Sequence, residues 1–170
     1  SLSITLFMSS LFLPKNDSLS KNIEKQVQKE IRKTFNVEIF NLEQNTFKIP
    51  NNSFLQASTF LEIRTQETLQ GYAFIGTAPS KTDSFEYLVL LNKDLIIVKA
   101  KVLIYREDYG GEIGSKRWLS QFISKDRFSI LGYGKEIIPI SGATISVKSM
   151  TSSINHLLQS LQGFEIETTP

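Results

Sequence analysis

The sequence predicts an α+β fold: a mostly antiparallel sheet with an amino-terminal helix, a short helix and a long carboxy-terminal helix. Two observations carry this prediction. Near both ends of the chain, apolar residues recur at spacings of three and four, which indicates helices that bury one face. Between them lie short runs rich in branched and aromatic residues, which indicate strands. The 170 residues, 41% of them hydrophobic, are enough for one core.

The chain opens on SLSITLFMSSLFLP (1–14), an apolar segment without charged residues. A membrane-spanning helix needs roughly 20 residues, but this segment matches the apolar part of a secretory signal or of an anchor. A strand packed on the fold is the alternative. PKNDSLSKN then resembles a solvated linker. We therefore expect residues 1–18 to hold a signal or anchor remnant and a linker, and the protein to be extracytoplasmic and membrane-associated.

The first helix is expected from Leu19 to Phe35. Ile23, Val27 and Ile31 recur there every four positions among charged and amide side chains. Strand-like runs follow at NVEIFNL, NTFKIP, STFLEIRT and GYAFIGTA, with turn-forming residues between them. SFEYLVLLNKDLIIVKAKVLIY then predicts a hairpin of two long strands on either side of NKD.

Two helices are expected after this hairpin. The first is short and lies in SKRWLSQFISK, with Ser115 as its cap and one apolar face. That face consists of Trp118, Leu119, Phe122 and Ile123. The second is long and covers residues 143–162, where apolar residues fall at spacings of four and three and Gly163 follows as a stop signal.

Composition excludes several kinds of site. The chain has no cysteine, so disulfides, thiolate catalysis and thiolate metal sites are ruled out. Its single histidine, His156, cannot form a multi-histidine metal site, although a site built from oxygen ligands remains open. The net charge of +2 comes from interleaved acids and bases, which gives little support for a nucleic-acid partner. We expect no catalytic residue and no metal ligand.

The start of the long helix, ISGATISVKSM, has unusual turn chemistry. We expect Ser141 at the cap position, Gly142 and Ala143 in a tight turn, and Thr144 in the first helical turn. A helix amino terminus favours a phosphate through its unpaired N–H groups and the positive end of its dipole. The small residues would let that phosphate approach the backbone. A capped helix after a small-residue turn is also a common structural feature.

SGATIS (141–146) resembles the Ser/Thr-Gly-Ala-Thr-x-Ser/Thr flavinylation motif of the FMN-binding domain family. That family includes the FMN-carrying subunits of the sodium-translocating NADH:quinone oxidoreductase and of the Rnf complex. Its core Thr carries FMN through a phosphoester, and this position falls on Thr144, while Ser146 matches the final hydroxyl. GYAFIGTA and YREDYGGEIGSKRWLSQF also resemble the family, so the resemblance covers about residues 68–162. The family usually carries Asp three residues before the core Ser, where this chain has Ile138.

The resemblance implies an electron carrier with covalent FMN. Its partners would be a Mg-dependent flavin transferase that uses FAD as donor, and redox proteins of a membrane electron-transport chain. Thr144 would be a tether rather than a catalyst. Trp118 could stack on the flavin ring, although its spacing favours the core. The other residues implied at the site are Ser141, Gly142, Ala143, Ser146, Glu107, Gly110, Gly111, Glu112 and Ile113.

We expect residues 19–67 to form an amino-terminal helix and strands, and residues 68–166 to form the FMN-binding domain. Two other functions remain open. One is a non-flavin binding module on the same fold, which the Ile138 departure favours. The other is a reductase with noncovalent FMN, for which Glu107 and Glu112 are the candidate acid or base groups.

Overall fold

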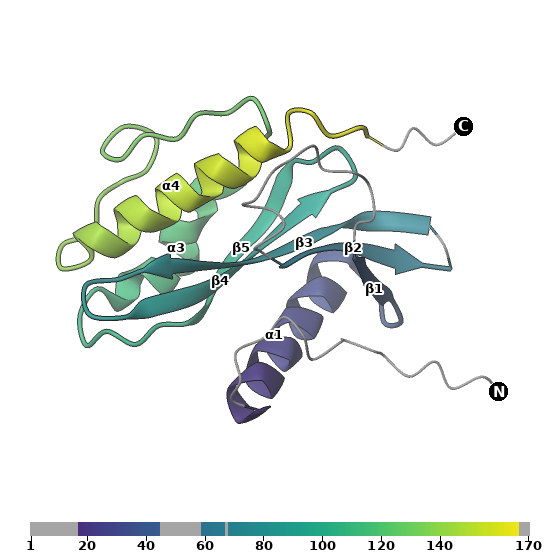
Figure 1. Ribbon diagram of the computed structural model, residues 1–170, viewed down its shortest axis with the longest axis horizontal. Coiled ribbons are helices and arrows are strands. Elements are labelled where there is room, and N and C mark those ends of the chain that lie inside the picture. Colours follow the sequence, from purple (N-terminus) through teal and green to yellow (C-terminus); the bar gives the residue numbers. More distant parts are fainter. Residues whose placement is uncertain (1–16, 45–58, 67, 167–170) are drawn as a thin grey trace.

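The computed structural model describes residues 17–44, 59–66 and 68–166. Within them the chain forms α helices, a five-stranded sheet and two 3-10 helices, η1 and η2 (Figure 1). The predicted α+β fold is confirmed. The bounds are α1 Asp17–Phe35, β1 Asn41–Gln44, β2 Thr59–Thr65, β3 Thr68–Pro79, β4 Ser84–Asn92, β5 Ile97–Ile104, η1 Gly111–Gly114, α3 Lys116–Leu119, η2 Ser120–Phe122 and α4 Thr144–Ser160.

Helix α1 is amphipathic, as its four-residue spacing predicts. Ile23, Val27 and Ile31 are fully buried against the sheet. The helix ends where Asn36 takes a left-handed conformation, φ 54°, and the Val37 N–H donates to the Arg32 carbonyl at 3.2 Å. This bond spans five residues and is typical of a Schellman termination.

All strand pairs of the sheet are antiparallel, in the order β1–β2–β3–β4–β5. The predicted hairpin of β4 and β5 is confirmed, and the Asn92 side chain holds its turn by accepting from the Asp94 and Ile96 N–H groups. The predicted start of the first strand, at residue 36, is wrong. Strand β1 begins at Asn41, because Phe40 buries its ring beside α1 and does not join the sheet. The expected strand NTFKIP and the apolar start of the chain lie outside the described residues.

The sheet has helices on both faces, so β3 and β4 are buried on both sides (Figure 1). In β4, Tyr87, Val89 and Leu91 face the core beneath α4, whereas Leu88 and Leu90 face α1. This explains the unbroken apolar run of that strand. Because β2 pairs with β3 along its length, the segments expected as 19–67 and 68–166 contribute to one sheet.

Two further helices complete the α4 face. Ser115 caps α3 by accepting from the Trp118 N–H at 3.2 Å, as predicted. The expected short helix is α helical only to Leu119 and continues as η2, after which Ile123 is extended. Helix α4 packs along β3, where the Ser149 hydroxyl donates to the Pro79 carbonyl at 2.5 Å. In the part of the chain that the structure describes, no helix is long and apolar enough to span a membrane.

Candidate functional site

Thr144 is the first residue of α4 and is exposed. The N-cap position belongs to Ala143, whose side chain has no polar group. The prediction that Ser141 caps this helix is therefore wrong: Ser141 lies two residues earlier, in the turn. Gly142 makes that turn with φ 78°, a left-handed conformation that favours glycine.

The amino terminus of α4 has unsatisfied donors. The first helical bond of its backbone runs from the Val147 N–H to the Ala143 carbonyl at 2.9 Å. Within residues 17–44, 59–66 and 68–166, no group accepts from the N–H of Thr144, Ile145 or Ser146. The first turn also has no acidic residue that could offset the positive end of the dipole. This end of α4 is therefore suited to an anion.

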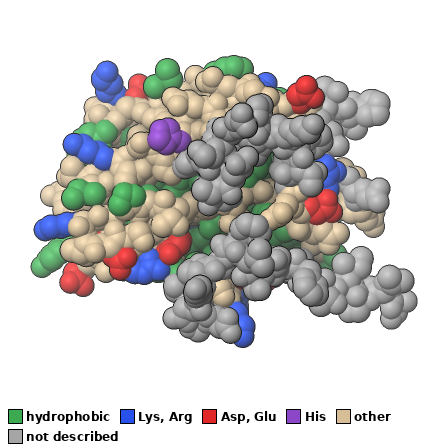
Figure 2. All heavy atoms as spheres, viewed as in Figure 1, with side chains coloured by type: hydrophobic (Ala, Val, Ile, Leu, Met, Phe, Trp, Pro, Cys, Tyr) green, Lys and Arg blue, Asp and Glu red, His purple; other side chains and the backbone are tan. Residues whose placement is uncertain are grey.

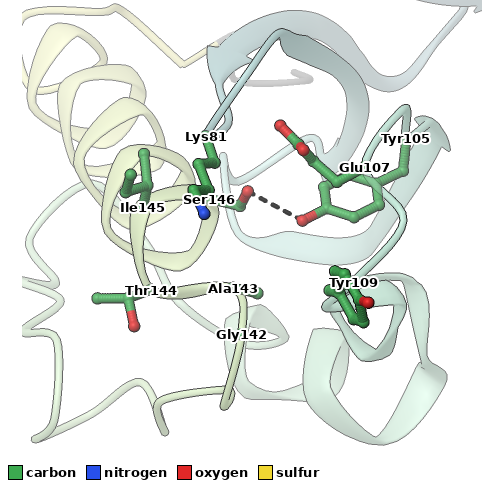
Figure 3. A pocket seen from close by; sticks show the side chains of 9 residues that line it. All are labelled: Lys81, Tyr105, Glu107, Tyr109, Gly142, Ala143, Thr144, Ile145 and Ser146. Atoms are coloured by element: carbon green, nitrogen blue, oxygen red, sulfur yellow. Dashed lines mark hydrogen bonds between the residues drawn. The ribbon is translucent and has the colours of Figure 1, made fainter.

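A pocket of about 300 Å³ adjoins this helix start. It is built from the β3–β4 turn, the segment after β5, and the beginning of α4 (Figure 3). Thr144 lies at its rim, with a side chain directed away from the Tyr105 and Glu107 side chains. The lining residues are Lys81, Tyr105, Glu107, Tyr109, Gly142, Ala143, Thr144, Ile145 and Ser146.

Tyr105 and Ser146 form one wall of the pocket. Their hydroxyl groups lie 3.0 Å apart and share a hydrogen bond (Figure 3). Ser146 is buried, with 2% of its surface exposed, and its hydroxyl is already engaged. Of the hydroxyl side chains in SGATIS, those of Ser141 and Thr144 are therefore the exposed ones.

Glu107 ties the segment after β5 to the β3–β4 turn. Its carboxylate accepts from the Thr82 N–H at 2.7 Å and from the Thr82 hydroxyl at 2.9 Å. The Ser80 hydroxyl beside it, together with these Thr82 donors, lowers the pKa of Glu107 to about 2. The carboxylate thus stays ionised at neutral pH and fixes the turn that carries Lys81 at the pocket.

Acid should weaken the hydrogen bonds between the Glu107 carboxylate and Thr82. Since the pKa of Glu107 in the folded protein lies below its ordinary value of 4.5, its stabilising effect is complete above that pH and is lost as the pH falls towards 2. We expect the wild type to be more stable than Glu107→Gln at neutral pH, and the difference to shrink across this window. Urea unfolding at a series of pH values measures it. A difference that stays constant between pH 4.5 and 2 would contradict this role.

Gly110 joins the two segments that the sequence analysis singled out. It has φ 79°, and a Cβ added to it would overlap the Cβ of Ala143. The loop after β5 and the turn before α4 are therefore in direct backbone contact, although they are more than 30 residues apart in sequence. Only glycine fits this position without displacing the turn.

The other expected site residues lie elsewhere. Gly111 and Glu112 are exposed at the start of η1 and do not line the pocket. Ile113 is fully buried in the core. Trp118 is 4% exposed and packs edge-on against Phe122, while its indole N–H donates to the Ile138 carbonyl at 2.8 Å. Core packing of Trp118, which its spacing favours, is therefore confirmed.

Sequence reasoning missed four lining residues: Lys81, Tyr105, Tyr109 and Ile145. Tyr109 and Ile145 are among the large apolar side chains left exposed, at 79% and 49%. Tyr109 lies within the stretch YREDYGGEIGSKRWLSQF that resembles the family, so an aromatic residue beside the paired glycines was an available signal. No local sequence signal points to Lys81, because the pairing of β3 with β4 brings this residue to the site. His156 is exposed on α4, about three turns from Thr144 (Figure 2).

No protein-family model matches the chain, and no curated protein sequence matches it. The resemblance of SGATIS to the flavinylation motif therefore stays a prediction.

Proposed function

We propose that this protein is an electron carrier that holds FMN covalently, through a phosphoester to the Thr144 hydroxyl. The observation that carries the proposal is the position of this hydroxyl: exposed, on the first residue of a helix without a side-chain cap, and at the rim of a pocket. Among the exposed hydroxyl groups of SGATIS, it is the one on the helix itself.

The helix start suits the phosphate of such an ester. A phosphate on Thr144 would lie next to the N–H groups of Thr144, Ile145 and Ser146, which have no acceptor among the described residues. Lys81, from the β3–β4 turn, lies beside Ile145 and Ser146 and adds a positive charge to the pocket (Figure 3). These donors would stabilise the ester's negative charge and fix the direction in which the attached group leaves the helix.

The pocket and its rim suit the remainder of the group. The volume of the pocket, about 300 Å³, is at the lower end of the roughly 300 to 1,000 Å³ found for small-molecule sites. A tricyclic ring would therefore extend over the rim, where the exposed ring of Tyr109 and the side chain of Ile145 offer apolar surface. When bound, FMN would supply the electron-transfer chemistry, and the chain's own residues would hold and orient it.

Attachment is a group transfer that balances without any oxidant. The Thr144 oxygen attacks the phosphorus on the FMN side of FAD, the bond to the bridging oxygen breaks, AMP leaves, and the hydroxyl proton passes to a base. A threonine hydroxyl needs activation for this reaction. His156 is too far along α4 to supply it, so we assign activation to a separate Mg-dependent flavin transferase.

The proposed setting is extracytoplasmic and associated with a membrane electron-transport chain. It rests on the apolar composition of residues 1–14, which matches a signal or anchor segment. Redox proteins of that chain would be the partners that donate and accept electrons.

Intact-mass measurement tests the proposal. The full chain is produced with and without a flavin transferase and denatured before analysis. We expect an added mass equal to FMN less one water, and a yellow colour that survives denaturation, only when the transferase is present. Flavin that is released on denaturation would instead favour a reductase with noncovalent FMN. Unmodified, colourless protein with an active transferase would overturn the proposal.

A further inference from the structure

Helix α1 carries a row of lysines on its exposed side. Lys21, Lys25, Lys29 and Lys33 follow one another at intervals of four residues, and all four are exposed. Residues four apart are neighbours on one side of a helix. We call this set the α1 lysine stripe. It lies apart from the buried face formed by Ile23, Val27 and Ile31.

The stripe is not neutralised within the fold. In the described part of the chain, none of its four ammonium groups forms an ion pair. Of the three acids on α1, Asp17 is the first residue of the helix, four positions before Lys21. Glu30 faces β5 and pairs there with Lys101 at 2.8 Å and Lys99 at 3.7 Å. Glu24 lies outside the arc that the stripe occupies, because it falls about 60° from Lys21 on the side away from Lys25. One side of α1 is therefore positively charged from Lys21 to Lys33.

The positive charge continues beyond the helix. A groove of about 350 Å³ lies between α1, β5 and α3, and Lys33 of the stripe is among its lining residues. Its charged lining residues are Lys33, Lys99, Lys101, Lys116 and Glu30. Burial acts to raise the pKa of Glu30, but the hydrogen bond from Lys101 and the other nearby lysines outweigh it and lower that pKa. With four lysines and one glutamate, the groove carries an excess of positive charge.

We propose that the α1 lysine stripe and the adjoining groove bind the surface of a membrane rich in anionic phospholipid. Exposed lysines near a bilayer surface attract anionic headgroups. Protein interfaces are instead depleted in lysine and enriched in aromatic residues and arginine. The apolar side chain of Ile39, 85% exposed in the segment that follows α1, is suited to insertion beside the headgroups. Its neighbour in the sequence, Glu38, is exposed and acidic.

Binding through this surface would orient the protein relative to the membrane. Helices α1 and α4 lie on opposite faces of the sheet (Figure 1). In the view of Figure 2, acidic and basic side chains are scattered among apolar ones in the part of the surface around α4. A membrane on the α1 side would therefore leave the pocket at Thr144 accessible from the other side. The inference does not depend on whether that pocket carries a flavin.

Vesicle binding tests the inference. The full chain is mixed with vesicles of phosphatidylglycerol and phosphatidylcholine, or of phosphatidylcholine alone, and the bound fraction is measured by co-sedimentation. Any contribution of the apolar residues 1–14 to binding is the same for both kinds of vesicle. The ratio of the affinity for anionic vesicles to the affinity for neutral vesicles therefore reports on charge. We expect tighter binding to the anionic vesicles, weakened by salt. Lys21→Gln/Lys25→Gln/Lys29→Gln should reduce the preference on the order of a hundredfold, about fivefold per lysine.

A second triple variant provides the matched control. Lys93→Gln/Lys135→Gln/Lys148→Gln removes the same charge from exposed positions outside α1, and should keep most of the preference. Lys21→Arg/Lys25→Arg/Lys29→Arg keeps the charge and should bind like the wild type. An equal loss in the two glutamine variants would overturn the inference. So would a wild-type chain without preference for anionic vesicles, which would assign the stripe to another partner such as an acidic protein.

Discussion

Replacing Thr144 by valine is expected to abolish covalent flavin attachment. Valine has nearly the shape of threonine but lacks the hydroxyl oxygen that would form the phosphoester. Because Thr144 is exposed and its side chain makes no hydrogen bond among the described residues, the stability of the fold should change by no more than about 0.5 kcal/mol. The measurement is the intact mass of the variant after production with the transferase, with thermal unfolding as the check on folding.

Thr144→Ser is the matched control, since it keeps a hydroxyl at the same position. It should be modified, although at a different rate. A flavin that persists on Thr144→Val would show that another hydroxyl carries it. Ser141 would then be the candidate, because Ser146 is buried and bonded to Tyr105.

Gly110→Ala should cause the largest loss of stability among these substitutions, about 2 to 5 kcal/mol. A left-handed conformation costs a non-glycine residue about 1 to 2 kcal/mol. Overlap of the new Cβ with that of Ala143 adds about 1 to 3 kcal/mol of overpacking. Relief of this overlap would move the turn before α4, so the fraction of flavinylated protein should fall as well. Urea unfolding and intact mass measure the two effects.

Gly111→Ala is the control for this prediction. A Cβ at Gly111 meets no atom within 4 Å, and its φ is not positive. The free energy of unfolding should therefore change by less than about 1 kcal/mol, and flavinylation should be unaffected. If the two alanine variants had equal stability, the contact between the loop and the turn would not be as described.

Much of the fold could be predicted from local patterns. The spacing of Ile23, Val27 and Ile31 predicts α1, and the run from Ser84 to Ile104 predicts the β4–β5 hairpin, because periodicity reports which side of an element is buried. The connection from α1 to β1 was harder. Val37 and Phe40 have the composition of a strand, yet they bury beside α1 without joining the sheet. Tertiary packing there overrides local propensity.

The site was predictable only in part. The small residues before Thr144 indicate a turn and a helix start, and both are present. The cap was assigned to Ser141 because serine commonly fills that role, whereas the left-handed Gly142 moves the helix start to Ala143 and Thr144. Lys81 reaches the site through strand pairing and the bonds from Thr82 to Glu107, which no local pattern reveals.

The central claim is that FMN is attached at one position, and fragmentation of a single peptide tests it most directly. Trypsin cleaves after Lys135 and Lys148, which leaves Ser141, Thr144 and Ser146 as the hydroxyl residues of the peptide between them. After production of the full chain with a flavin transferase, we expect the fragment ions to place FMN, attached through a phosphoester, on Thr144. A peptide that is unmodified, or modified at Ser141 or Ser146, would contradict the account.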